Sequence, residues 1–219
     1  MASTYAEEQK PRDSKSYEIV KKRNMTWIKK YLKDGRLLDL GGYNGRLTEE
    51  LSNVLLTDIA TSPLLHRVNP SHLPACVDMH FLPFKSASLD GVLLSHSLQH
   101  TPEPEVVIDE VFRVLKLSGK IFISVPNAAA FTQRWRLKRN GEVTPSGNRP
   151  GEKVMQFHQY TCENLMQFLK KKSFRVEKTY GSLLTFPLME KLGAYRVATF
   201  LADNFYRSAD SLFVVAKKI

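Results

Sequence analysis

The sequence has few cysteines and no long apolar run. Only Cys76 and Cys162 occur among 219 residues, which is too few for a disulfide framework and is typical of a reducing, cytoplasmic setting. No stretch of about 18 uncharged apolar residues is present, so we expect no membrane span. The first ten residues lack the apolar core of a secretory signal. The 42% of hydrophobic and 25% of charged residues are instead typical of a globular protein.

The dinucleotide fingerprint G-x-G-x-x-G is also absent, although residues 36–47 read RLLDLGGYNGRL. A short buried strand is expected over residues 37–40, and a glycine turn follows it at Gly41, Gly42 and Gly45. Tyr43 stands where the fingerprint needs its second glycine. Asp39 at the end of the strand would repel a pyrophosphate but would attract an ammonium group. We also predict a helix over residues 47–51, with its N-terminal amides at the crevice.

The net charge of +10 is unevenly distributed along the chain. Residues 36–133 hold 7 basic and 10 acidic side chains, whereas residues 134–178 hold 11 basic and 4 acidic ones. This excess favours an anionic partner or acceptor, such as a phosphorylated small molecule or RNA. An apolar acceptor such as a lipid is the alternative, and the residues that would suit it are Phe131, Trp135, Phe186 and Leu188.

Three polar positions follow the next apolar runs along the chain. Asp58 lies 19 residues after Asp39, close to the spacing of about 20 expected for an acid that binds ribose hydroxyls. The alternative for Asp58 is a helix N-cap. Ser95 and His96 follow a strand expected over residues 92–95, at the end where open α/β sheets bind ligands. His96 and His100 are four residues apart, but no third ligand accompanies them, so we expect no metal.

Four features in this order resemble the class I S-adenosylmethionine-dependent methyltransferases, of the small type 11-like kind. They are Asp39 with its glycines, Asp58, Asp78 with Leu82, Pro83 and Phe84, and the turn at residues 113–120. The resemblance implies a Rossmann-like, doubly wound α/β fold. Its sheet would have seven mostly parallel strands, with an antiparallel last strand and helices on both faces. The cofactor implied is S-adenosyl-L-methionine.

The resemblance also implies roles for individual residues. Asp78 would accept a hydrogen bond from the adenine amino group, and Met79 would pack on the adenine face. The alternative for this pair is a loop carboxylate beside a core methionine. The expected cofactor-binding set is Asp39, Gly41, Gly42, Tyr43, Gly45, Asp58, Ile59, Asp78, Met79 and Ser95. If a residue deprotonates the acceptor, His96 is the first candidate because of its place and its pKa range.

We expect one domain over residues 1–219, with additions at two places. An amphipathic helix over residues 14–33 would pack on the sheet edge, and Tyr17 or Trp27 could also cover the crevice. Residues 126–160 form a basic insertion on the acceptor side. Further elements are a helix capped by Thr161, strands over residues 75–77, 174–180 and 212–216, and a helix over residues 187–204.

The expected function is methyl transfer from S-adenosylmethionine to an O, N or C atom of an unidentified acceptor. The alternative function is that of a regulator or scaffold, which binds the cofactor without transferring its methyl group. Tyr43 keeps this second reading open, because the family generally has a glycine there.

Overall fold

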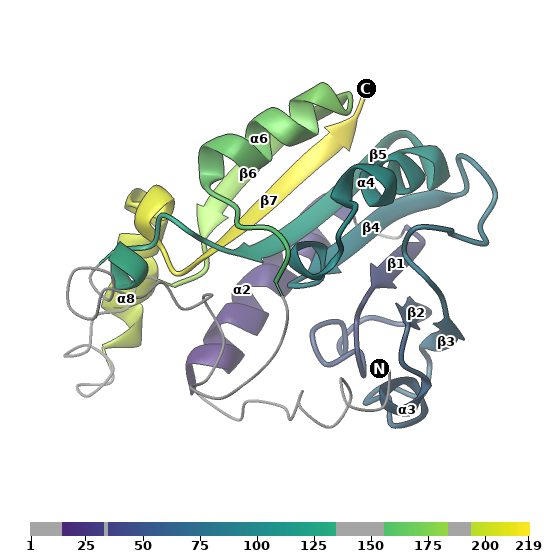
Figure 1. The fold of residues 1–219 in the computed structure, drawn as a ribbon. Helices are drawn as coiled ribbons and strands as arrows, with labels where there is room; N and C mark the ends of the chain where they lie inside the picture. Colours follow the sequence, from purple (N-terminus) through teal and green to yellow (C-terminus); the bar gives the residue numbers. More distant parts are fainter. Residues whose placement is uncertain (1–14, 33–34, 135–155, 184–193) are drawn as a thin grey trace.

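The computed structural model describes residues 15–32, 35–134, 156–183 and 194–219 (Figure 1). The strands are β1 (Leu37–Leu40), β2 (Leu55–Asp58), β3 (Leu73–Cys76), β4 (Leu89–Ser95), β5 (Leu115–Pro126), β6 (Phe174–Gly181) and β7 (Ser211–Lys218). The α-helices are α2 (Lys15–Leu32), α3 (Thr61–Leu65), α4 (Pro104–Val114), α6 (Cys162–Lys171) and α8 (Tyr195–Asn204). Short 3-10 turns lie at Leu98–His100 and Tyr206–Ser208.

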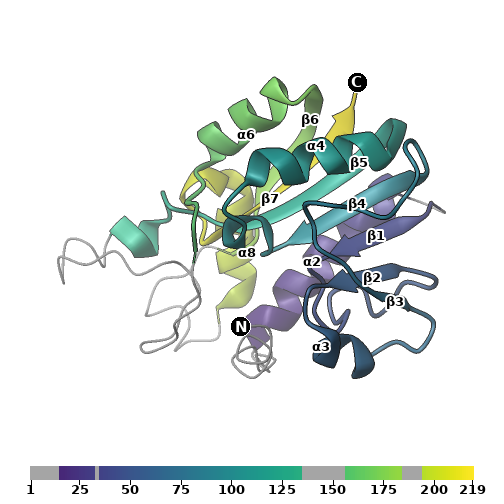
Figure 2. The same ribbon diagram turned by 45° about the vertical axis from the view of Figure 1, so that its right-hand side comes forward.

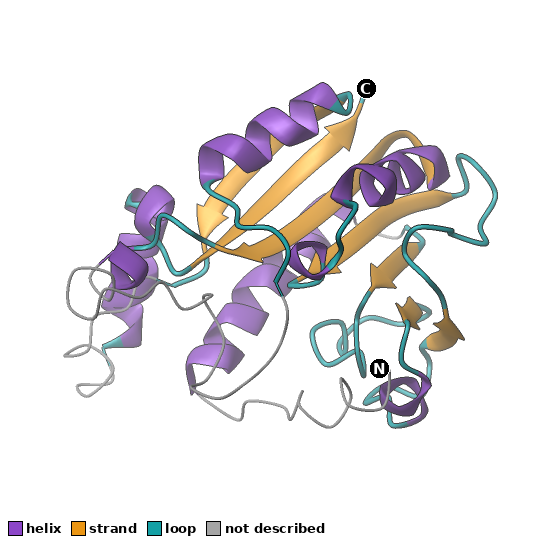
Figure 3. Cartoon of the chain, in the orientation of Figure 1, coloured by secondary structure: helices purple, strands orange, loops and turns teal. Residues whose placement is uncertain are grey.

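The seven strands form one sheet in the order β3-β2-β1-β4-β5-β7-β6 (Figure 3). Strands β1 to β5 pair in parallel, while β7 is antiparallel to both β5 and β6. The predicted fold is therefore confirmed, including the antiparallel last strand. The third strand begins two residues earlier than predicted, because Leu73 already pairs with Leu55 of β2.

Helices cover both faces of the sheet, and a separate apolar core lies under each cover (Figure 2). On one face, α4 and α6 bury Val107, Val111 and Leu165 against β1, β4, β5 and β7. On the other face, Met25 and Ile28 of α2 pack with central-strand residues such as Leu93 and Phe122. The helix predicted over residues 14–33 is therefore present as α2, but it covers a face of the sheet and not the edge of the sheet. Its buried side chains meet the apolar side of the central strands, which an edge position would leave exposed.

Helix α6 begins where the sequence indicates. The hydroxyl of Thr161 accepts from the amide of Asn164 at 3.3 Å, and the Asn164 side chain accepts in return from the Thr161 amide at 2.8 Å. This reciprocal pair satisfies two of the amides that a helix N-terminus leaves unbonded. The predicted cap is confirmed.

The helix predicted over residues 47–51 is wrong. The segment forms successive turns, in which Thr48 donates to the Gly45 carbonyl and Leu51 to the Thr48 carbonyl. Side chains from a later loop bind the carbonyls that a helix would use. Asn69 donates to the carbonyls of residues 49 and 51, and His72 Nε2 lies 3.2 Å from those of residues 48 and 51. No helix N-terminus therefore follows the glycine turn.

Several expectations fall outside the described residues. Most of the basic insertion, including Trp135, lies in residues 135–155, and the first part of the predicted helix 187–204 lies in residues 184–193. The second part of that helix is present as α8. Within the described ranges, no helix has the length and apolar character needed to cross a bilayer.

Candidate active site

Asp39 is a buried carboxyl group in the centre of the sheet. It occupies the third position of β1, between β2 and β4, and is 1% exposed. Its Oδ2 accepts from the Thr48 hydroxyl at 2.8 Å, while Oδ1 is buried with no hydrogen-bond partner. Burial raises the pKa of Asp39 to about 7, the Thr48 hydroxyl opposes the rise, and the charge of Asp58 adds to it. The site therefore holds an acceptor atom that lacks a donor.

The glycine turn is shaped by three left-handed residues. Gly41 and Gly45 have φ of 72° and 74°, and Tyr43 between them has φ of 54°. Tyr43 thus adopts the conformation that a glycine would adopt more easily, at a cost of roughly 1–2 kcal/mol. Gly42 has no positive φ. It is required for space, since a Cβ there would lie 2.5 Å from Cγ of Asp39.

Asp58 joins the end of β2 to the glycine turn. Its Oδ2 accepts from the backbone amide of Tyr43 at 3.0 Å, and its Oδ1 accepts from the amide of Ala60 at 3.0 Å. The carboxyl group is largely buried, and this burial raises its pKa despite the backbone donors. The Ile59 amide also bonds to this carboxylate, which still has acceptor capacity for a further donor. The Ala60 contact is a turn contact and not a helix cap, because α3 has Ala60 itself as N-cap without a side-chain bond, and the ribose role of Asp58 stays a prediction.

Asp78 is held by a histidine that the sequence did not single out. Its Oδ1 accepts from the His80 amide at 2.9 Å and lies 2.6 Å from His80 Nδ1. His80 Nε2 in turn lies 2.7 Å from the hydroxyl of Thr101, which follows the segment after β4. The spacing of two residues between Asp78 and His80 is the only signal for this contact in the sequence. The chain of contacts connects the loops that follow β3 and β4.

The end of β4 lies beside the glycine turn. The hydroxyl of Ser97 donates to the Leu40 carbonyl at 3.0 Å. Ser97 was not among the residues predicted from the sequence. A Cβ placed on Gly41 would lie 2.7 Å from the Cβ of Ser97 and 3.5 Å from the terminal methyl of Met79. The structure therefore brings together the turn, Met79 and the residues after β4. Ile59 is adjacent to Asp58 and is 59% exposed.

His96 occupies the first position after β4 with φ of 53°. Its amide donates to the Ser124 carbonyl at 2.8 Å, and its Nε2 lies 3.1 Å from the Ser124 hydroxyl. Ser95, the last residue of β4, pairs with Ser124 of β5. Both predicted residues therefore stand at the carboxyl end of a central strand. His100 lies apart in the next turn, with Nε2 3.1 Å from the Gln99 side chain.

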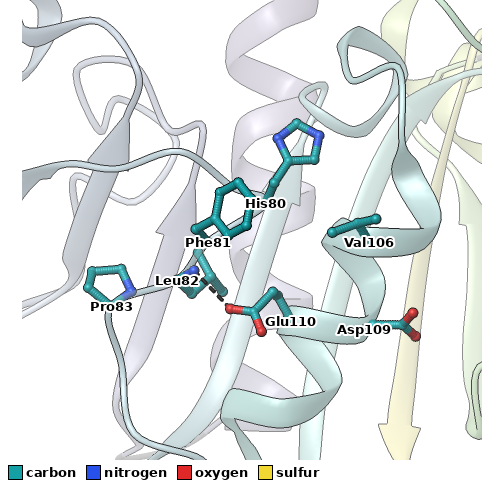
Figure 4. Close-up of a pocket in the computed structure, with 7 residues that line it drawn as sticks. All are labelled: His80, Phe81, Leu82, Pro83, Val106, Asp109 and Glu110. Atoms are coloured by element: carbon teal, nitrogen blue, oxygen red, sulfur yellow. Dashed lines mark hydrogen bonds between the residues drawn. The ribbon is translucent and has the colours of Figure 1, made fainter.

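Among the residues that the structure describes, no three His, Cys, Asp or Glu side chains gather as metal ligands would. A groove of about 600 Å³ lies outside the predicted cofactor set, between the loop after β3 and helix α4 (Figure 4). Figure 4 shows Phe81 and Val106 on its two sides, and the amide of Leu82 donating to Glu110 at 2.8 Å. Arg113 donates to the carbonyls of Leu82 and Phe84, so this groove is anchored by the motif residues.

The residues present fit S-adenosylmethionine. The unpartnered Oδ1 of Asp39 suits a cationic ammonium group, and the free acceptor positions of Asp58 suit vicinal hydroxyls. The exposed side chain of Ile59 and the thioether of Met79 suit the faces of an aromatic ring. These groups lie on consecutive strand ends of one sheet edge, as nucleotide sites of open α/β sheets do.

Comparison with known proteins agrees with S-adenosylmethionine as the ligand of this site. Residues 38–123 match the type 11 family model described as "Methyltransferase domain". An uncharacterised protein of Methanocaldococcus jannaschii is 28% identical over 114 residues, which are 52% of this chain and 56% of that protein. The match thus spans only about half the length of that curated relative.

Two solved structures share the fold. One, from Thermotoga maritima, carries the name "SAM-dependent methyltransferase, possible histamine N-methyltransferase". It has a TM-score of 0.67 and 17% identity, with 93% of this chain and 91% of that chain covered. The other is a SAM-dependent methyltransferase of Archaeoglobus fulgidus, with a TM-score of 0.62, 19% identity, and 92% and 94% coverage.

The fold is therefore that of S-adenosylmethionine-dependent methyltransferases of solved structure. The match to the methyltransferase domain model covers residues 38–123, which include Asp39, Asp58, Asp78 and Met79 of the predicted cofactor set.

Proposed function

We propose that the protein transfers the methyl group of S-adenosylmethionine to an O, N or C atom of an anionic acceptor. The observation that carries the proposal is the buried, unpartnered Oδ1 of Asp39, which stands beside a left-handed glycine turn within the segment that matches the family. A dinucleotide would instead bring a pyrophosphate to this carboxylate, and the two negative charges would repel each other.

Each residue of the set has a binding or orienting role in this proposal. When bound, the cofactor supplies an electrophilic methyl group on its sulfonium sulfur. Asp39 neutralises the ammonium group, and Asp58 accepts from the ribose hydroxyls. Asp78, whose carboxylate is fixed by His80, accepts from the adenine amino group. Met79 and Ile59 pack on the ring, while Ser95 and the turn residues Gly41, Gly42, Tyr43 and Gly45 line the remaining wall. Positioning and exclusion of water then supply most of the catalysis.

His96 is the proposed base for an acceptor that must lose a proton. It stands at the carboxyl end of β4, and Nε2 already lies 3.1 Å from the Ser124 hydroxyl. That contact holds the imidazole ring at the strand end where the acceptor would bind.

The charge of the acceptor is proposed from the sequence. Residues 134–178, which follow β5 and α4 along the chain, hold 11 basic and 4 acidic side chains. A specific observation also favours an apolar acceptor as the second candidate. Phe131 and Phe157 are 42% and 47% exposed. Phe157 donates its amide to the Gln99 carbonyl, which places it beside the segment that follows β4.

We expect S-adenosylmethionine and S-adenosylhomocysteine to raise the melting temperature, and NAD and NADP to leave it unchanged. At about 100 times its dissociation constant, a ligand adds roughly 2.7 kcal/mol to the free energy of unfolding. Differential scanning fluorimetry with each ligand at equal concentration measures the shift. Stabilisation by NAD alone would contradict the proposed cofactor.

The transfer itself is tested with S-adenosylmethionine labelled in the methyl group. We expect label to move into an anionic fraction of a cell extract, at a rate that falls as salt is added. Label that appears in the organic phase, independent of salt, would replace the anionic acceptor by the apolar one. Tight cofactor binding without transfer to any fraction would favour the regulator or scaffold.

A further inference from the structure

The face of the sheet under α2 carries a row of cations at one end. Lys120 of β5 and Arg175 of β6 are both direct cross-strand partners of Lys217 of β7. Such partners project from the same face of a sheet. Phe122, two residues after Lys120, belongs to the core beneath α2, so the three cations project on that side.

A fourth strand cation and a helix cation join this row. Lys178 pairs with Val215, another residue of the core under α2, after a bulge in β6. Lys178 Nζ lies 5.1 Å from the centre of the Trp27 ring, and Lys30 Nζ lies 5.0 Å from the same centre. We call the five cations the basic face: Lys30, Lys120, Arg175, Lys178 and Lys217.

The basic face is poorly neutralised. Among the described residues, its one ion pair with a carboxylate joins Lys120 to Glu177. Three other cations of α2 do have acidic partners: Lys21 with Glu49, Arg23 with Asp203 and Lys29 with Glu50. Like charges directly opposite each other on a sheet destabilise it. A bound polyanion would remove this repulsion.

We propose that the basic face binds the phosphodiester backbone of a single-stranded nucleic acid. Its cations come from four elements, α2, β5, β6 and β7, and this spread suits a chain of phosphates better than one enclosed phosphate. The aromatic rings at its centre, Trp27 and Tyr31, are half-buried in the helix–sheet packing. They are therefore not placed to insert into a lipid bilayer.

The basic face is separate from the proposed cofactor site. Arg175 lies near the amino end of β6 and Lys120 in the middle of β5, whereas the predicted cofactor set lies at the carboxyl ends of β1, β2, β3 and β4. Nucleic-acid binding here goes beyond methyl transfer and does not require it. It can be measured without cofactor, so either proposal can fail while the other holds.

The test compares two double variants with the same loss of charge. Lys178→Gln/Lys217→Gln removes two cations of the basic face, while Lys29→Gln/Lys116→Gln removes two that are paired with Glu50 and Asp90. Binding of a labelled single-stranded RNA, and of DNA of the same sequence, is followed by fluorescence anisotropy over a range of salt concentrations.

We expect the basic-face variant to reduce the slope of log affinity against log salt by about 1.4, at about 0.7 per phosphate contact. This slope corresponds to about 25-fold weaker binding at 0.1 M salt. The paired-lysine control should bind nearly as the unmodified protein does. Thermal unfolding should show the basic-face variant at least as stable as that protein, because the substitutions relieve repulsion.

Comparing the affinities for RNA and for DNA of the same sequence identifies which nucleic acid the basic face prefers. Equal losses in both double variants would mean that net charge alone drives binding, and would overturn the proposal. So would a failure of RNA and DNA to bind while phosphatidylserine vesicles bind, because the face would then belong to a membrane surface.

Discussion

Replacing Asp39 with Asn should stabilise the ligand-free protein at pH 8 by up to about 4 kcal/mol and should weaken cofactor binding. Burial raises the pKa of Asp39 from 3.8 to about 7, and one unit corresponds to about 1.4 kcal/mol. Because the pKa of the folded state is the higher one, the destabilisation is absent below about pH 4. It grows as the pH rises and is complete above about pH 7. The free energy of unfolding of the Asp39→Asn variant should not depend on pH in this way.

Urea unfolding of both proteins at several pH values between 5 and 8 measures the difference. The matched control is Asp90→Asn. Although burial acts to raise the pKa of Asp90, the Lys116 ammonium and the Arg36 amide lower it overall. This control should therefore lose stability at neutral pH. A stability difference between wild type and Asp39→Asn that does not change with pH would contradict the buried, charged Asp39.

The effect of Asp39→Asn on cofactor binding should be opposite to its effect on stability. A hydrogen bond to a charged group contributes about 1.5–3 kcal/mol, so Asp39→Asn should raise the dissociation constant of S-adenosylmethionine by at least tenfold. A variant that becomes more stable and binds more weakly would show that the buried carboxyl is retained for its ligand. Unchanged affinity in calorimetry would remove Asp39 from the cofactor site.

Asp58→Ala should weaken cofactor binding by about 2–3 kcal/mol, or roughly 30- to 150-fold. The variant loses the acceptors proposed for two ribose hydroxyls. It also leaves the amides of Tyr43 and Ala60 without their carboxylate, so we expect a lower melting temperature as well. Isothermal titration calorimetry is to be done well below that temperature, where the variant is folded.

Asp58→Asn separates the two roles of this side chain. The amide oxygen can still accept from one backbone donor, so most of the stability should return. It is a weaker acceptor for the ribose than a carboxylate, and binding should remain impaired. If both variants are less stable but bind the cofactor with full affinity, Asp58 only holds the turn.

The sequence predicted the central part of the fold because its signals there are local. The strand that contains Asp39, the acid at the end of β2 and the cap at Thr161 each depend on residues close together in the chain. The turn tolerates Tyr43 because Asp58, from the next strand, binds its amide in the left-handed conformation.

What could not be predicted depends on contacts between distant segments. The turns at residues 47–51 replace a helix because Asn69 and His72 bind their carbonyls. His80 was missed because its partner Thr101 is 21 residues away. The basic face arises only when β5, β6 and β7 are adjacent, since Lys120 and Lys217 are far apart in the sequence.

The position of β7 fixes the order in which the sheet can be completed. It is the last strand of the chain, yet it lies between β5 and β6 and pairs with both. Strand β6 therefore has no neighbour in the sheet until residues 211–218 have left the ribosome. During synthesis, the exposed edges of β5 and β6 are available for wrong pairing, which is a hazard for aggregation. Folding of this edge must follow translation of the last strand.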